Sequence, residues 1–72
     1  MLRHFQREAI KESLAEVFPA ENIRGHETGD YIKFTRKELA KKELESLLTI
    51  AQTEDVEVII RRSGTGLSIT FI

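Results

Sequence analysis

Residues 56–72 constrain the fold most, because they alternate between apolar and polar side chains in two runs joined by a glycine-containing segment. A period of two residues is the pattern of a β-strand that buries one face and exposes the other. Residues 61–66 lie between the runs and contain Gly64 and Gly66, which can adopt the positive φ angles of tight turns. The segment therefore predicts a β-hairpin with one apolar face. The apolar face consists of Val56, Val58, Ile60, Leu67, Ile69 and Phe71.

The beginning of the sequence predicts an amphipathic helix that could cover this face. Its apolar side chains fall within one broad arc at the rotation of about 100° per residue that an α-helix gives. They are Leu2, Phe5, Ala9, Ile10, Leu14, Val17 and Phe18. Pro19 cannot continue the helix and disfavours a helical conformation in the residue before it. We therefore expect the helix to end near Val17 or Phe18.

A second helix is predicted to begin near Thr35. Thr35 and Glu38 have the spacing of a capping box, in which the two side chains satisfy backbone N–H groups at the start of a helix. An apolar stripe with helical spacing follows, and we expect the helix to run to about Thr53. The stripe consists of Ala40, Leu44, Leu47, Leu48 and Ala51.

The segment between the two helices predicts a second, weaker hairpin. We expect a short strand over residues 22–26 and another over residues 31–34, where Ile32 and Phe34 share one face. The element order is then α-β-β-α-β-β. It predicts a single α+β domain over residues 1–72, a two-layer sandwich with two helices packed on one face of a four-stranded, mainly antiparallel sheet. This order is one circular permutation away from the ferredoxin-like order β-α-β-β-α-β, an architectural analogy that carries no function.

Length and composition narrow the class of protein. A domain of 72 residues buries only about 60% of the surface of its unfolded chain, so its stability is marginal unless something adds to it. The chain has no cysteine for disulfides, and His4 and His26 are too few for a metal site, so we expect no cofactor. Self-association is the remaining common stabiliser of small domains.

No catalytic signature is present in the sequence. His26 lies beside Glu27, but no serine or cysteine nucleophile with a plausible partner accompanies them, so we expect a protein that is not an enzyme. No apolar run approaches the roughly 20 residues of a membrane span, and the first residues do not resemble a secretory signal. We therefore expect a cytoplasmic protein with no membrane contact.

Ile59 and Ile72 favour a protein-interaction module. Both point away from the helices if the apolar face of the hairpin points toward them, and Tyr31 lies on the outward face of its strand. Isoleucines on a nominally exposed face are typical of an interface. We expect a homodimer that joins through the sheet face or an edge strand and presents its charged helices to an unidentified partner protein.

The alternative is a small nucleic-acid-binding protein. Basic residues surround the start of the second helix and the turn of the last hairpin, where backbone N–H groups could also hold phosphate. They are Lys33, Arg36, Lys37, Lys41, Lys42, Arg61 and Arg62. Interleaved glutamates and a net charge of −1 are equally compatible with an ordinary solvated surface.

Overall fold

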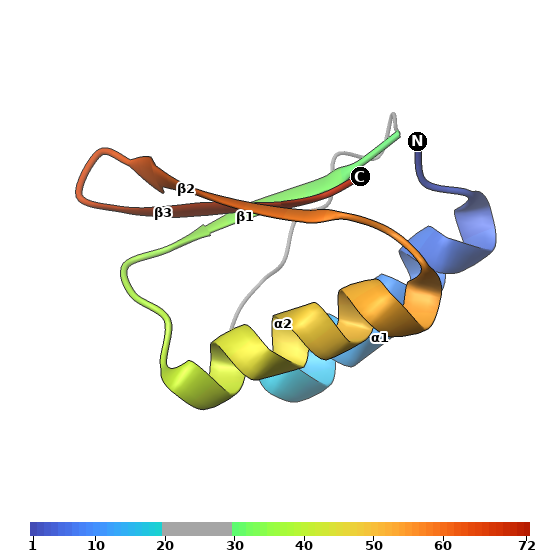
Figure 1. Cartoon of the computed structure of the whole chain (residues 1–72), viewed down its shortest axis with the longest axis horizontal. Coiled ribbons are helices and arrows are strands. Elements are labelled where there is room, and N and C mark those ends of the chain that lie inside the picture. Colours follow the sequence, from blue (N-terminus) through green and yellow to red (C-terminus); the bar gives the residue numbers. More distant parts are fainter. Residues whose placement is uncertain (20–29) are drawn as a thin grey trace.

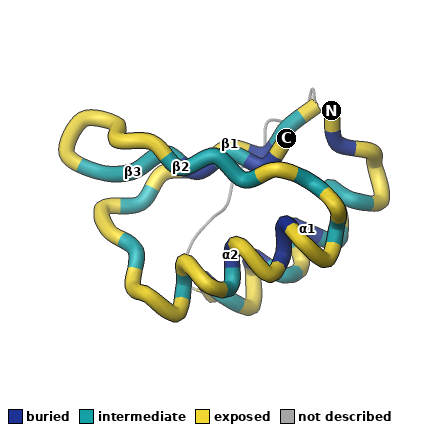
Figure 2. The backbone as a smooth tube through the Cα atoms, in the orientation of Figure 1, coloured by how far each residue is buried: buried dark blue, intermediate teal, exposed yellow. Residues whose placement is uncertain are grey.

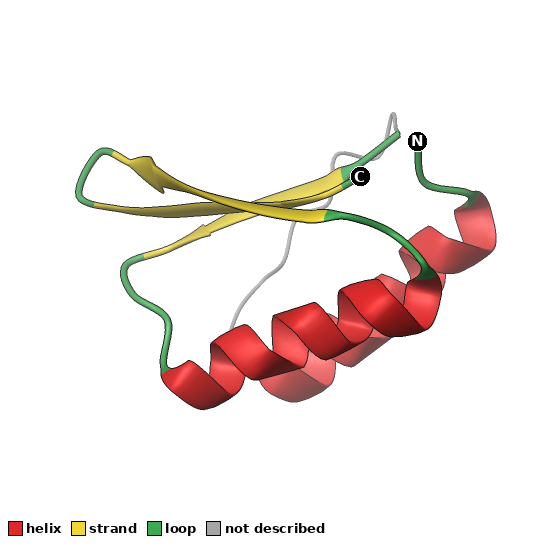
Figure 3. Cartoon of the chain, in the orientation of Figure 1, coloured by secondary structure: helices red, strands yellow, loops and turns green. Residues whose placement is uncertain are grey.

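Two helices lie along one face of an antiparallel sheet in the computed structural model (Figure 1). The structure describes residues 1–19 and 30–72, and all statements below concern these residues. Figure 3 shows the helices and strands in chain order. They are α1 (His4–Val17), β1 (Ile32–Arg36), α2 (Lys41–Glu54), β2 (Val58–Ser63) and β3 (Gly66–Phe71). The predicted α+β class is confirmed.

β3 is the central strand of the sheet, whose order is β1-β3-β2. Phe71 pairs with Ile32 on one side and with Val58 on the other, and both pairings are antiparallel. The side chains of Ile69 and Phe71 are 0% exposed. They alternate with Ser68 and Thr70, so one face of β3 lies entirely in the core between sheet and helices.

The described sheet has three strands, and the prediction of a four-stranded sheet is not matched. The strand expected over residues 22–26 lies outside the described residues, and so does the first half of the hairpin expected from Ile23 to Phe34. The strand expected over residues 31–34 is β1, and its described partner is β3. A ferredoxin-like sheet needs four strands, so these three do not establish that arrangement.

α1 ends at Val17, as Pro19 predicts, and its start is tied to the end of α2. The Gln6 side chain accepts from the Arg3 N–H at 2.9 Å and donates from Nε2 to the Glu54 carbonyl oxygen at 2.8 Å. The two helices therefore run antiparallel. Neither helix is long and apolar enough to span a membrane within the described part of the chain.

Phe5 does not join the core, contrary to the expectation from the sequence. Its side chain is 62% exposed, whereas Leu2, Ile10, Leu14 and Phe18 are buried. Phe5 lies five residues before Ile10, which places it about 140° around the helix from that buried residue. The buried face of α1 is therefore narrower than the apolar arc predicted from the sequence.

The predicted capping box at Thr35 is wrong. Thr35 pairs with Ser68 inside the sheet, and α2 begins only at Lys41. The carboxylate that reaches back is that of Glu43, whose Oε1 accepts from the Ala40 N–H at 2.8 Å. Pairing of β1 with β3 overrides the local capping signal, because the strand continues through Arg36. The end of α2 at Glu54 agrees with the prediction.

The apolar stripe of α2 is only partly buried. Leu47, Ile50 and Ala51 are in the core, but Leu44 is 38% exposed and Leu48 is 48% exposed. Figure 2 shows the exposed residues along the outer side of α2. The flank that carries both leucines is opposite the one that borders α1, where Ser46 and Thr49 line a hollow with α1 residues.

The last hairpin closes more tightly than the sequence suggested. Ser63 pairs with Gly66, which leaves Gly64 and Thr65 as a two-residue turn. Gly64 has a φ of 60°, as a type II′ turn requires at its first central position. A Cβ on Gly66 would lie 2.5 Å from the Arg36 carbonyl oxygen, so glycine allows the end of β1 to approach β3 closely.

Gly66→Ala should destabilise the protein by about 1–3 kcal/mol, because a backbone oxygen of β1 cannot give way as a flexible side chain would. Urea denaturation followed by circular dichroism measures the loss. The control is Ser63→Ala, an exposed neighbour across the same turn, which should change stability by less than about 0.5 kcal/mol. Equal stability of Gly66→Ala and wild type would contradict the close packing of β1 on the hairpin.

Candidate interaction surface

The face of the sheet opposite the helices, called the open face below, is formed by alternate residues of all three strands (Figure 1). Ile32, Phe34, Ile69 and Phe71 point into the core, so their neighbours in each strand point outward. Two cross-strand rows result, in which each β3 residue has a neighbour on either side. The rows are Lys33, Thr70 and Ile59, and Thr35, Ser68 and Arg61.

The structure brings Ile59 and Ile72 close together on this face. Ile59 pairs with Thr70, two residues before Ile72, so the two isoleucines are diagonal neighbours. Ile72 is 41% exposed and Ile59 is half-buried. Tyr31, the third predicted interface residue, is half-buried and precedes β1 at the same end of the sheet. These three residues give the open face an apolar corner.

β2 is an edge strand, a property that sequence reasoning could not identify. Glu57 and Ile72 exchange both backbone hydrogen bonds, at 3.1 and 3.0 Å. Because such pairs alternate in an antiparallel ladder, residues 59, 61 and 63 also bond to β3. The N–H and C=O groups of Val58, Ile60 and Arg62 then point away from β3, and no described strand pairs with them. These outward groups are called the β2 edge below.

The exposed flank of α2 lies on the same side of the molecule as the β2 edge. α2 packs against both β2 and α1. Figure 1 agrees, since α1 is the more distant and fainter helix. Leu44 and Leu48 therefore lie in the helical layer on the same side of the molecule as the β2 edge. Val58 and Ile60, whose side chains are half-buried against the core, border it from the sheet.

Arg36, one of the predicted phosphate-binding residues, is engaged within the protein. Its guanidinium lies 4.3 Å from the centre of the Phe18 ring, and its Nη2 is 3.4 Å from Oε2 of Glu43. Its Nε also donates to the Glu38 carbonyl oxygen at 3.5 Å. The side chain is 20% exposed. Arg36 thus joins the end of α1 to the start of α2, which is a structural role.

The other predicted basic residues lie on two different faces. Lys33 and Arg61 are on the open face, whereas Arg62 stands in the row of Arg36 and Leu67, which points toward the helices. All of these lysines and arginines apart from Arg36 are exposed. They are Lys33, Lys37, Lys41, Lys42, Arg61 and Arg62. The fold therefore brings the hairpin and the start of α2 to one end of the molecule without forming a single cationic face.

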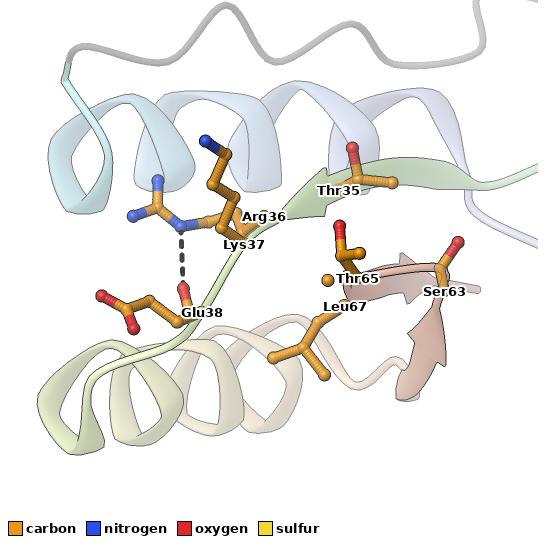
Figure 4. A pocket seen from close by; sticks show the side chains of 8 residues that line it. Thr35, Arg36, Lys37, Glu38, Ser63, Thr65 and Leu67 are labelled. Carbon is orange, nitrogen blue, oxygen red and sulfur yellow. Dashed lines mark hydrogen bonds between the residues drawn. The ribbon is translucent and has the colours of Figure 1, made fainter.

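A hollow of about 610 Å³ lies where the end of β1 meets the hairpin turn. Its lining residues are Thr35, Arg36, Lys37, Glu38, Ser63, Thr65, Gly66 and Leu67. Figure 4 shows the side chains of Arg36 and Lys37 extending away from the hydroxyl groups of Ser63 and Thr65. The cations and hydroxyls therefore do not converge on one point, as they would in a preformed phosphate site.

The histidine candidate cannot be placed. His26 and the surrounding segment 25–29 lie outside the described residues. His4 is exposed at the start of α1, where its Nδ1 lies 3.3 Å from Arg7 Nη2. Within residues 1–19 and 30–72, no group of three or more histidine, aspartate or glutamate side chains could hold a metal ion.

Comparison of the chain with protein-family models, with curated proteins and with solved structures finds no match. The function of the protein is therefore inferred from the geometry of the described residues. Two features of the structure are relevant to it. One is the apolar corner of the open face beside the β2 edge, and the other is the exposed basic side chains near the start of α2.

Arg36→Gln should destabilise the protein by about 1–2 kcal/mol, because it removes both the cation–π contact with Phe18 and the ion pair with Glu43. Thermal unfolding measures the change. Lys37→Gln, an exposed neighbour that also loses one positive charge, should be nearly neutral. If both variants unfold at the same temperature, Arg36 does not hold the two helices and β1 together.

Proposed function

We propose that this protein is a small non-enzymatic interaction module that self-associates through its sheet, either by the open face or by the β2 edge. The observation that carries the proposal is the position of Ile59 and Ile72 as diagonal neighbours at an edge strand, β2, whose outer side has no described partner. Apolar side chains next to unpaired backbone groups are a favourable surface for a second chain.

The size of the protein supports the same proposal. A 72-residue chain without cysteine has neither a large core nor disulfides to stabilise it. Large apolar side chains nevertheless remain at least one third exposed, among them Leu44, Leu48 and Ile72. Covering such side chains on association adds hydrophobic stabilisation that the single chain lacks. The charged outer sides of α1 and α2 would then face a partner protein.

Sedimentation equilibrium of the full chain at high micromolar concentration should give twice the chain mass of 8.3 kDa, with dissociation on dilution. Ile59→Thr keeps a β-branched side chain in the strand but removes apolar contact, so it should weaken association about five- to tenfold. Glu12→Gln, an exposed change on α1, should leave association unchanged. A mass of 8.3 kDa at every concentration would refute self-association.

We propose nucleic-acid binding as the second candidate function. It is favoured by the exposed side chains of Lys37, Lys41, Lys42 and Arg62, which lie toward the end of the molecule where the hairpin turn and the start of α2 are found. The engagement of Arg36 with Phe18 and Glu43 weighs against it. The cations would contact the phosphate backbone without reading the base sequence.

If this second function holds, affinity for mixed DNA and RNA should fall on the order of a hundredfold between 50 and 200 mM salt, through release of counterions from about four phosphates. Fluorescence anisotropy measures the change. The double variant Lys41→Gln and Lys42→Gln should flatten the dependence on salt, whereas Lys11→Gln on α1 should not. No binding at low salt would exclude this function.

A further inference from the structure

We propose that two copies of the chain join edge to edge through antiparallel pairing of β2, with a twofold axis passing between the two Ile59 residues. This inference rests on the proposed self-association and specifies its surface and register. The two three-stranded sheets then form one continuous six-stranded sheet.

The backbone of β2 is ready for such pairing. The N–H and C=O groups of Val58 and Ile60 point away from β3, as the bonded pair of Glu57 and Ile72 requires. When the axis passes through Ile59, Val58 of one copy stands opposite Ile60 of the other. These two residues can exchange both backbone hydrogen bonds. The two Ile59 residues then form the closer, non-hydrogen-bonded type of pair.

The charged side chains of β2 favour a second copy of this chain as the binding partner at the edge. Residues 57–61 read Glu-Val-Ile-Ile-Arg, so reversal about Ile59 places Glu57 of each copy opposite Arg61 of the other. Both side chains are exposed and lie on the open face with Ile59. Two ion pairs then flank a central apolar pair. Opposite charges directly across two strands are favourable, and like charges are unfavourable.

The alternative register, with the axis at Ile60, lacks this complementarity. It places Arg61 opposite Ile59 and Arg62 opposite Val58, so neither arginine meets a carboxylate. Backbone pairing alone permits both registers, because Val58, Ile60 and Arg62 all point outward. The side-chain charges therefore favour the register centred on Ile59.

The helical layer supports the same surface. Leu44 and Leu48 lie on the flank of α2 that faces away from α1 and toward the β2 edge. A twofold axis at this edge brings the two α2 helices toward each other, and the same apolar patch then meets its copy, as in any isologous interface. The partial exposure of a predicted core stripe is thereby explained.

Charge reversal tests the register. Glu57→Arg and Arg61→Glu each convert both ion pairs into like-charge pairs, so each variant should self-associate on the order of ten- to thirtyfold more weakly. An equimolar mixture of the two variants, or the double variant carrying both changes, should regain wild-type association, because each Arg then faces a Glu again. Sedimentation equilibrium measures all four samples. Recovery in the mixture also shows that both single variants are folded.

Cysteine cross-linking separates edge pairing from face-to-face packing of two sheets. The chain has no native cysteine, and the Cα atoms of a non-hydrogen-bonded pair are about 4.5 Å apart, within disulfide range. Ile59→Cys should form a covalent dimer under mild oxidation. Thr70→Cys, on the same face but in the central strand, should not.

Edge pairing is wrong if wild type sediments as a dimer but both charge variants associate as tightly, or if Thr70→Cys cross-links as fast as Ile59→Cys. Self-association itself stands in both cases. A wild-type chain that is monomeric at every concentration refutes both proposals.

Discussion

The central position of β3 is the constraint on which the other elements depend. β1 and β2 do not pair with each other, and β3 is the one described strand to which each of them is hydrogen-bonded. The same strand buries Ile69 and Phe71 completely, so the helices must cover that side. One face of the sheet and the outer edges of β1 and β2 then have no described covering element. The surface available for a partner is thus a consequence of how the core is built.

Arg36 is a basic residue whose charge is used inside the protein. In the sequence it belongs to a basic cluster, and in the structure its guanidinium lies over Phe18 and beside Glu43. A buried aromatic ring and a nearby carboxylate compete with any external phosphate for this cation. The remaining basic residues lie on separate faces, so they attract a phosphate backbone less strongly than the same number of charges on one face would.

Periodicity predicted both helices, the last hairpin and the outward direction of Ile59 and Ile72, because these depend on residues close in sequence. It failed where contacts between residues far apart in the sequence determine the structure. Thr35 has a good local capping signal, but pairing with Ser68 keeps it in a strand. Leu44 and Leu48 fit a helical stripe, yet they lie on the flank of α2 that faces away from α1 and remain exposed. The edge itself follows from the pairing of β1 with β3, which no local pattern reveals.

The order of the strands along the chain also has a consequence for synthesis. β3 follows β1 and β2 in the sequence, although it lies between them in space. A ribosome that has completed β2 has therefore produced two strands with no common neighbour and an apolar helix stripe without its cover. The sheet can close only after β3 has been synthesised, so its pairing must follow the synthesis of both outer strands. Until then, the apolar residues of β2 remain accessible to chaperones and to other nascent chains.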